Sequence, residues 1–500
     1  MRKFIAMLLA GMLLFCCAGA AAEETQKAPD FILEGFDGDS SNHVWDTNLF
    51  FARMQEKTGI SFQFRQYSDY DQWTERKKAL LEGEDLPDVL FKAGLTAGEV
   101  RDLYGQGRIV DLKPYLEEYA PDLWQLLNSR EDWMQAVTLE DGSIPALPNF
   151  NELQNNDLMW INSSWLKTLR LEMPSTAEEL TEVLRAFKTG DPNRNGKTDE
   201  IPLTFLGMWE LRFLGHAFGI IDNDFYVACR DGVVSSSLTS EQNRAFLAWL
   251  HQLWEEELLD HHGFSTADTL RQITDTNAAI PYGMMLSSTP MTVVPANALS
   301  QYSVLLPLSF NGRQEYRDLL GDVVRGTFAV TSACQNPAKL VSWVNVLYTE
   351  EGSRLAQAGL EGEDYIWNED GYWEWMNDTS TVANVTLPEA TIAEGGAAPG
   401  ITTVDFQLRY GESETRNLIE QLNNMKAYTV LPYPFVTLSA EDEKRVAELH
   451  AVIAPYAEQT MASFVSGDLA LTDESWKAFC DRLEELGLNE AVSIWQKYIH

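Results

Sequence analysis

Cysteine is scarce in this sequence, which has five among its 500 residues. Cys16 and Cys17 lie in the first apolar stretch, so Cys229, Cys334 and Cys480 are left for the body of the chain. Three cysteines form at most one disulfide bond, and the protein is therefore not a disulfide scaffold. A chain of this length suffices for two or three domains, whose cores must form by hydrophobic packing.

Positive charge is also in short supply. The chain has 37 Lys and Arg residues against 75 Asp and Glu residues, which gives a formal net charge of −38 at pH 7. A surface this acidic repels phosphate backbones, so we expect no nucleic-acid partner. The same surface keeps an exported protein soluble and attracts cations such as calcium.

Long hydrophobic runs are lacking after residue 22. Before that point, Arg2 and Lys3 precede an uncharged stretch that ends in Ala and Gly residues, which is typical of an export signal. We therefore interpret residues 1–22 as a signal peptide and residues 23–29 as a polar tether. A membrane-spanning helix is the alternative, because the stretch is nearly long enough, but its small-residue end and the acids that follow favour export.

The two adjacent cysteines raise the question of a lipid anchor. Lipid-anchored bacterial exports carry a cysteine at the end of the apolar stretch, usually after a small residue, and Phe15 and Cys16 match that preceding position poorly. Two outcomes stay open. Cys16 or Cys17 carries a lipid that holds the protein on the extracellular face of the membrane, or cleavage after Ala20 or Ala22 releases it to the periplasm or the medium.

Sequence motifs of common enzymes are missing. The chain has no nucleophile elbow, phosphate-binding loop, zinc-protease motif or dinucleotide fingerprint. Carboxylate pairs are too frequent in so acidic a chain to indicate a glycosidase by themselves. Apolar stretches typical of strands, at residues 31–36, 60–67 and 86–91, alternate instead with helical patterns near 45–57 and 71–84. This order predicts an α/β fold with a parallel sheet.

One polar loop, "DPNRNGKTDE" at residues 191–200, begins like a calcium-binding loop. Its oxygen donors would be five side chains and the main-chain carbonyl of Lys197. The six residues are Asp191, Asn193, Asn195, Lys197, Asp199 and Glu200. Pro202 replaces the last glutamate of an EF-hand loop, so the pattern is incomplete. A plain polar turn is the alternative, but this many spaced oxygen donors favours a hard cation.

Aromatic residues are plentiful, with 15 Trp and 17 Tyr. The densest cluster is "DYIWNEDGYWEW" at residues 364–375, where the rings are interleaved with polar residues. We therefore expect some of these rings to face a cleft or a surface. Sugars stack their C–H faces on aromatic rings while polar side chains bind their hydroxyl groups, so the cluster favours a carbohydrate ligand.

Five stretches resemble the extracellular solute-binding proteins of ABC-type carbohydrate importers, in particular the lipoprotein subgroup that includes the alginate-binding proteins. The stretches are residues 80–91, 107–127, 165–204, 336–367 and 456–499. The third is the most specific, and it contains the helix "MPSTAEELTEVLRAFKTG" followed by the calcium-type loop. Together the stretches span nearly the whole chain after the signal peptide, whereas residues 205–300 match only loosely.

The resemblance implies a two-lobed periplasmic-binding-protein-like fold of type II, an α/β fold with a hinge and a ligand cleft between the lobes. It implies a first lobe of residues 30–150 and 302–360, and a second lobe of residues 151–301 and 361–500. It also implies a structural Ca2+ ion in the loop at 191–200, on the second lobe and away from the sugar.

The same resemblance implies a monomer that is not an enzyme. Such a protein binds a carbohydrate, here expected to be an oligosaccharide, and delivers it to the permease subunits of the transporter in the membrane. Loops at strand ends that face the cleft supply the predicted ligand contacts. These are Phe36, Asp37, Lys92, Trp160, Trp209, Tyr282 and Trp367. For each of them the alternative is a role in packing or solvation.

Other functions stay open on the sequence. One is a secreted calcium-containing glycoside hydrolase or polysaccharide lyase, which would turn over its substrate. Another is a surface module for adhesion or sensing without transport, and a peptide or another solute could replace the sugar. The acidic surface disfavours a polyanionic glycan unless Lys and Arg residues gather in the cleft.

Overall fold

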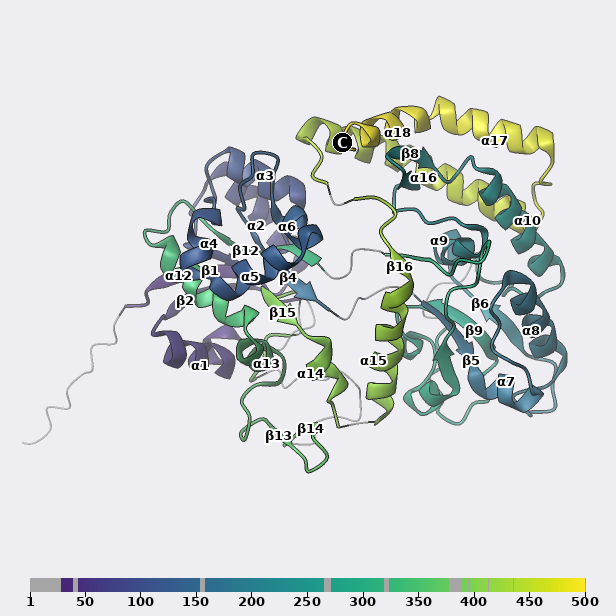
Figure 1. Ribbon diagram of the computed structural model, residues 1–500, viewed down its shortest axis with the longest axis horizontal. Helices are drawn as coiled ribbons and strands as arrows, with labels where there is room; N and C mark the ends of the chain where they lie inside the picture. The colour runs from purple at the N-terminus through teal and green to yellow at the C-terminus, as the bar shows by residue number, and fades with distance from the viewer. Residues whose placement is uncertain are drawn as a thin grey trace, which may run out of the picture.

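The computed structural model describes residues 28–38, 44–152, 158–264, 271–318, 323–376, 389–393, 396–411, 413–434 and 436–499. The predicted signal peptide, its two cysteines and most of the tether lie outside these residues. The described residues form two lobes that stand side by side (Figure 1). Each lobe has its own sheet and its own hydrophobic core. The two-lobed α/β architecture is as predicted.

Lobe 1 is built on a six-stranded sheet with the strand order β15-β4-β12-β3-β1-β2. Strand β12 is antiparallel to both of its neighbours, and the other pairs are parallel. The strands are β1 (Phe31–Phe36), β2 (Phe62–Tyr67), β3 (Val89–Phe91), β4 (Leu147–Asn151), β12 (Val323–Val330) and β15 (Gly400–Thr402). The helices of this lobe are α1 (Leu49–Thr58), α2 (Tyr70–Glu82), α3 (Ala97–Gly105), α4 (Lys113–Tyr119), α5 (Pro121–Ser129), α6 (Glu131–Val137), α12 (Pro337–Asn345), α13 (Glu350–Ala358) and α14 (Val404–Leu408).

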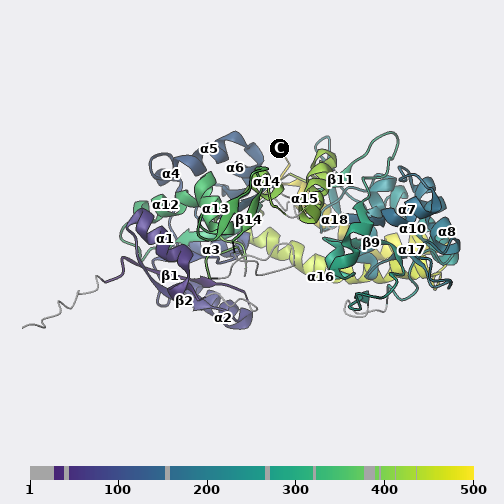
Figure 2. The same cartoon turned by 90° about the horizontal axis from the view of Figure 1, so that it is seen from below.

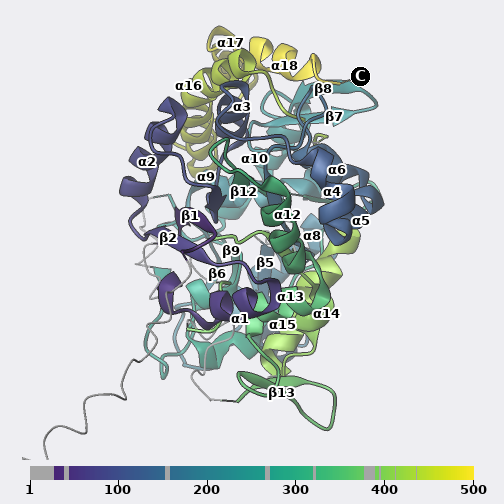
Figure 3. The ribbon, with the colours of Figure 1, turned by 90° about the vertical axis from the view of Figure 1, so that its left-hand side faces the viewer.

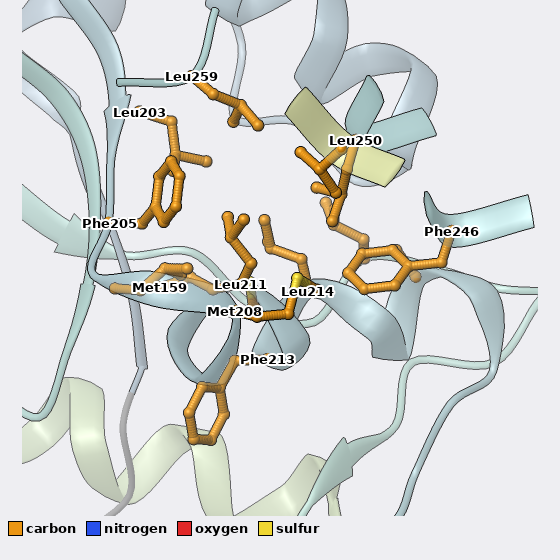
Figure 4. Packing of buried hydrophobic residues seen from close by; sticks show 14 of the residues in the cluster. Met159, Leu203, Phe205, Met208, Leu211, Phe213, Leu214, Phe246, Leu250 and Leu259 are labelled. Atoms are coloured by element: carbon orange, nitrogen blue, oxygen red, sulfur yellow. The ribbon is translucent and has the colours of Figure 1, made fainter. Parts of the chain in front are cut away.

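Lobe 2 is built on a four-stranded sheet with the order β10-β5-β9-β6. Its strands are β5 (Leu158–Asn162), β6 (Ile201–Thr204), β9 (Tyr282–Ser287) and β10 (Tyr302–Val304). The helices are α7 (Ser163–Leu169), α8 (Ala177–Thr189), α9 (Gly207–Leu211), α10 (Glu241–Glu255), α15 (Ser413–Met425), α16 (Ala440–Ser466), α17 (Asp473–Glu485) and α18 (Leu488–Gln496). Side chains from the sheet, α9 and α10 share one core, part of which is shown in Figure 4.

Smaller elements complete both lobes. The strands are β7 (Val227–Arg230) with β8 (Val233–Ser236), β11 (Tyr316–Arg317) with β16 (Thr429–Val430), and β13 (Tyr365–Trp367) with β14 (Trp373–Trp375). The short 3-10 helices are Trp45–Thr47, Arg212–Phe218, Pro290–Thr292, Ala296–Gln301, Val346–Tyr348 and Lys426–Tyr428.

The local sequence explains the helices that frame the lobes. In α8 the Thr176 side chain accepts a hydrogen bond from the Glu179 main-chain N–H, which caps the first turn. Leu180, Leu184 and Phe187 follow at helical spacing and are all buried against lobe 2. The helix ends at Thr189, directly before Gly190, where the sequence predicted its end.

The lobes divide the chain differently from the prediction in two segments. Residues 302–318 lie in lobe 2, because β10 pairs with β5 and Tyr316 is buried in the lobe 2 core. The described residues between 361 and 411 lie with lobe 1, because β15 pairs with β4 and Ile401 is buried in the lobe 1 core. The chain therefore passes between the lobes after β4, before β12 and between α14 and α15.

Candidate functional site

The strand directions bring one edge of each sheet to the crossings between the lobes. In lobe 1, β1, β2, β3, β4 and β15 are mutually parallel, so their carboxyl ends share one edge, and the chain leaves for lobe 2 from the end of β4. In lobe 2 the carboxyl ends of β6, β9 and β10 share an edge with the start of β5, where the chain arrives. Ligands of α/β proteins bind at such carboxyl edges. The candidate site is therefore formed by these two edges.

An aromatic pair stands at the lobe 1 edge. Phe36 is the last residue of β1, and its ring contacts Tyr70 edge to face, with 5.8 Å between the ring centroids. Tyr70 begins α2 directly after the Asp69 cap, and its side chain is 56% exposed. The prediction for Phe36 placed it correctly at this edge. Tyr70 was missed, although its position just after the strand at 60–67 was a usable signal.

A single exposed indole stands at the lobe 2 edge. Trp209 is 45% exposed and lies in α9, which follows the carboxyl end of β6. Its neighbours Met208 and Leu211 are buried in the lobe 2 core (Figure 4), which leaves Trp209 on the outer side of the short helix. Gly207 has a φ of 61°, and a Cβ atom there would lie 3.2 Å from Trp209 Cδ1. Glycine at this position therefore gives the indole room against its own turn.

A buried ion pair holds the turn that presents this indole. The Arg271 guanidinium donates two hydrogen bonds to the Glu210 carboxylate, 2.8 and 3.0 Å long, and both side chains are less than 5% exposed. Glu210 also accepts the Leu206 main-chain N–H at 2.7 Å. The sequence reasoning missed both charged residues, because nothing in a single sequence shows that they are partners.

Tyr282 supports this arrangement from within the core. Its hydroxyl group donates to the Arg271 carbonyl at 3.0 Å, its ring is 7% exposed, and burial raises the pKa of the phenol. Trp160 is 1% exposed, and its Nε1–H donates to the Ser287 carbonyl at 2.9 Å. Both residues were predicted ligand contacts. The structure gives them structural roles instead, because their polar groups are satisfied inside lobe 2 and their rings offer no open face.

Asp37 and Lys92 also differ from their predicted role. They follow β1 and β3 at the lobe 1 edge, as expected, but they form an ion pair whose side chains are fully buried. Asp37 accepts the Trp45 Nε1–H at 2.8 Å, and Lys92 donates to the Ile392 carbonyl at 3.2 Å. Lys92 has a φ of 51°, a conformation that is uncommon outside glycine. The pair therefore ties the strand ends together and stiffens the edge that carries Phe36.

The aromatic cluster at 364–375 forms a hairpin with its own small core. Trp367, Trp373 and Trp375 lie with Tyr365 on one face of β13 and β14, as the cross-strand pairs show. Trp373 stacks on Phe406 of α14 at 4.6 Å between ring centroids. Trp367 is half-buried in this cluster, where its ring contacts Phe406 edge to face with 6.2 Å between the ring centroids. Its ring consequently belongs to hairpin packing, and the alternating polar residues occupy the turn and the opposite face.

The loop at 191–200 lies at the other end of β6 from Trp209. The Asn195 side chain donates to Asp199 at 2.8 Å, and Asp191 accepts the Asn195 main-chain N–H at 3.1 Å. Glu200 is the exception, since both of its carboxylate oxygens are buried without a hydrogen-bond partner. Burial, Asp199 and Asp191 raise the pKa of Glu200.

These groups fit a divalent cation. No three His, Cys, Asp or Glu side chains in the described part of the chain are grouped as a metal site, so an ion in this loop would also need the carboxamide oxygens and the Lys197 carbonyl. The unpartnered Glu200 carboxylate is the kind of group that a cation would satisfy.

The buried carboxylates at the two edges do not form a hydrolytic pair. Asp37 is held by Lys92 and Trp45, and Glu210 is held by Arg271. A glycosidase needs one free carboxylic acid and one carboxylate on opposite sides of the sugar. Both carboxylates instead form ion pairs with cations of their own lobe.

Comparison with known proteins agrees with this architecture. No family model matches the chain. The chain is 26% identical to the fructooligosaccharide ABC transporter substrate-binding protein FusA of Streptococcus pneumoniae, over 96% of this chain and 95% of FusA. It is also 26% identical to the polygalacturonan/rhamnogalacturonan-binding protein YtcQ of Bacillus subtilis, over 26% of this chain and 25% of that protein.

Solved structures share the fold along almost the whole chain. FusA in complex with kestose superposes with a TM-score of 0.70 at 23% identity, covering 93% of this chain and 98% of FusA, and FusA has also been solved as an EF-hand mutant. An HMO-binding solute-binding protein of Bifidobacterium longum infantis gives 0.75 at 23% identity, with 93% and 97% covered. The alginate-binding protein AlgQ2 without calcium ion gives 0.66 at 18% identity, with 95% and 98% covered. The resemblance to carbohydrate-importer solute-binding proteins and the two-lobed fold are confirmed.

One further observation concerns the membrane. Within the described residues, no helix combines the length and the apolar character that are needed to cross a bilayer.

Proposed function

We propose that this protein is the extracellular solute-binding component of an ABC importer. It binds a neutral oligosaccharide between its lobes and delivers the sugar, chemically unchanged, to permease subunits in the membrane. The observation that carries this proposal is the similarity to FusA along nearly the full length of both chains. A relative of this extent shares both lobes and the crossings between them, which is where a two-lobed binding protein holds its solute.

The chemistry of the two edges supports a sugar. Phe36 and Tyr70 in lobe 1 and Trp209 in lobe 2 supply aromatic faces, on which the C–H faces of a sugar ring stack. Closing the lobes would place a sugar between aromatic groups of both sides. Because the solute binds the closed form better, its binding shifts the population of lobe orientations toward closure.

The charges at the edges support a neutral sugar over a uronic-acid polymer. Lys92 is paired with Asp37, and Arg271 is paired with Glu210. An acidic sugar needs cations that its carboxylates can reach. Lys92 and Arg271 are already neutralised, although Arg325 at the start of β12 has no ion pair among the described residues. The strongly negative net charge of the chain adds repulsion against a polyanion.

A calorimetric titration tests the proposal. The mature protein is titrated with kestose and longer fructooligosaccharides, with neutral human-milk-type oligosaccharides, and with oligomers of galacturonate and guluronate. We expect heat with at least one neutral glycan and a dissociation constant near 1 μM, about −8 kcal/mol. Absence of heat with every oligosaccharide contradicts the proposal. Release of new reducing ends during long incubation would instead support the hydrolase or lyase alternative.

We also propose a structural Ca2+ ion in the loop at 191–200. Asp191, Asn193, Asn195, Asp199 and Glu200 would hold it with side-chain oxygens, and Lys197 with its carbonyl. When bound, the ion neutralises the crowded carboxylates of this loop. Since β6 separates the loop from Trp209, the ion acts on the stability of lobe 2 and not on the sugar.

The final part of the proposal is the cellular location. The protein is exported and then either held by a lipid on Cys16 or Cys17 or released. Membrane fractionation of the wild type and of the double variant Cys16→Ser, Cys17→Ser in a bacterial host separates the two. Release of the double variant alone supports the anchor, and equal release of both proteins supports cleavage after the signal peptide.

A further inference from the structure

The two lobes touch directly where α16 of lobe 2 approaches α3 of lobe 1. Figure 2 shows α16 reaching across to lobe 1, and Figure 3 shows its first turns beside α3. The Arg101 guanidinium of α3 forms an ion pair with the Glu443 carboxylate of α16. A second N–H of Arg101 donates to the Leu438 carbonyl, which lies just before α16. One arginine thus binds both the side chain and the backbone at the beginning of this helix.

The side chains of this ion pair are less exposed to solvent than those of an ordinary surface ion pair. Arg101 is 22% exposed and Glu443 is 38% exposed, and Arg101 Nε is buried without a hydrogen-bond partner. The arginine has therefore lost water to reach Glu443, a cost that exposed pairs do not carry.

Glycine at position 98 leaves room for this close approach. A Cβ atom added at Gly98 in the first turn of α3 would lie 3.0 and 3.2 Å from the two carboxylate oxygens of Glu443. These distances are too short for an unshifted carboxylate. The negative charge also lies beside the first turn of α3, where the helix dipole favours it.

A second cation of lobe 1 interacts electrostatically with the same carboxylate at longer range. Arg325 lies in β12, shortly after the chain returns from lobe 2, and the structure shows no hydrogen bond or ion pair within 4 Å for it among the described residues. Burial lowers the pKa of Arg325, and the charge of Glu443 opposes that change. Arg325 also lines an interlobe pocket of about 250 Å³, together with Asp318 and Tyr433 of lobe 2. The Glu443 carboxylate is therefore attracted by two arginines of lobe 1, Arg101 in an ion pair and Arg325 at longer range.

We propose that Glu443 is an interlobe latch, which fixes the lobe orientation of this structure by docking against Gly98 and Arg101 of the opposite lobe. The latch acts on the equilibrium between orientations and does not depend on which solute the protein binds. A partly exposed ion pair of this kind changes the ratio of two populations by about two- to fivefold. Any solute that binds one orientation better then has its apparent affinity set in part by the latch.

Distances between the lobes report the latch without any solute. Spin labels are placed on Glu117→Cys in α4 and Glu178→Cys in α8, both exposed, in protein that lacks residues 1–22 and in which Cys229, Cys334 and Cys480 have been replaced. Pulsed electron paramagnetic resonance then gives the distance distribution. We expect Glu443→Gln to broaden or shift the main distance and to reduce its population about two- to fivefold.

Two further variants separate the latch from folding. Gly98→Ala removes no charge and strengthens α3 as a helix, yet its Cβ atom displaces the Glu443 carboxylate by a few tenths of an ångström, so it should alter the distribution in the same direction and to a smaller extent. Glu490→Gln is the control. It breaks an ion pair between α18 and Arg445 of α16, the helix that also carries Glu443, but both partners lie in lobe 2. It should therefore leave the distribution unchanged.

The charge swap Arg101→Glu with Glu443→Arg should restore part of the wild-type distribution. Small-angle X-ray scattering of the unlabelled proteins must rank the variants in the same order by the change in their radius of gyration. If Glu443→Gln and Gly98→Ala both leave the distances as in the wild type, the latch does not exist. If Glu490→Gln changes them as much as Glu443→Gln does, the effect is not specific to the interlobe contact and the proposal is overturned.

Discussion

Arg271 and Glu210 form a bidentate ion pair directly beneath the turn that exposes Trp209. The pair is buried, and it joins a segment near residue 271 to the helix that follows β6. The position of the exposed indole is therefore set by charges in the interior of lobe 2. The first two predictions test the indole and the ion pair separately.

Replacing Trp209 with Ala should weaken the binding of a neutral oligosaccharide such as kestose by about tenfold, since one stacking face is lost. Trp209→Phe should retain most of the affinity. The melting temperature should change little, because the side chain is 45% exposed. Calorimetric titration and thermal unfolding check both parts, and unchanged affinity in Trp209→Ala would remove the indole from the site.

Glu210→Gln removes the carboxylate charge that accepts two hydrogen bonds from the buried Arg271 guanidinium. Breaking a buried pair from one side destabilises a protein by about 3 kcal/mol, and we expect a loss of this size in the free energy of unfolding of lobe 2, measured with denaturant. Affinity for the sugar should fall as well, because the turn is no longer fixed. Glu361→Gln, at an exposed position of lobe 1, is the matched control and should change neither quantity.

Calcium should reverse the effect of one substitution. With chelator present, Glu200→Gln should stabilise the protein at pH 7, because the wild-type carboxylate is buried without a partner and has a raised pKa. With calcium present, the same change removes a ligand and should destabilise the protein relative to wild type.

The calcium effect is measured by calorimetric melting with and without the ion. Calcium at one hundred times its dissociation constant should add about 2.7 kcal/mol to the wild type. A wild-type melting curve that is the same in calcium and in chelator would contradict the proposed ion. Sugar affinity should differ by less than about twofold between the two conditions, because the loop lies at the far end of β6.

His216 makes lobe 2 sensitive to mild acid. Burial lowers the pKa of this imidazole to about 4, below its usual value of 6.5. The folded state therefore holds the neutral ring, and the stability that this gives is present above pH 6.5 and is lost as the pH falls toward 4. The loss reaches up to about 3 kcal/mol.

His216→Gln tests this effect, since a glutamine side chain can donate to the Phe213 carbonyl and accept from the Leu308 N–H as the imidazole does. Denaturant unfolding between pH 7 and pH 5 should show a shallower decline for the variant. Parallel curves for the two proteins would show that His216 does not titrate on unfolding.

Local structure could be predicted from the sequence where neighbouring residues determine it. The strand at Phe31–Phe36 and the end of α8 before Gly190 follow from hydrophobic pattern, capping and glycine, which act within a few residues. The lobe boundaries depend on pairings across long separations. Tyr302 pairs with Asn162, and nothing near Tyr302 in the sequence shows that its strand belongs to lobe 2.

The candidate site shows the same division. The predicted strand ends placed Phe36, Asp37 and Lys92 at the lobe 1 edge, whereas Trp209 follows β6, a strand that the sequence analysis did not name. Whether a side chain stays open to a solute depends on its partners in space, and Asp37 and Lys92 satisfy each other. Trp160 and Tyr282 are strand residues whose polar groups find acceptors inside the core, so the alternation of the strand could not decide their exposure.

The four residues of β6 separate a metal-type loop at one end from an exposed indole at the other. A substitution at Trp209 that changes the proposed solute preference therefore need not weaken the part of lobe 2 that a bound ion would reinforce. For protein engineering, position 209 is accordingly the part of α9 to vary in a biosensor library, with its buried neighbours and residues 191–200 kept constant.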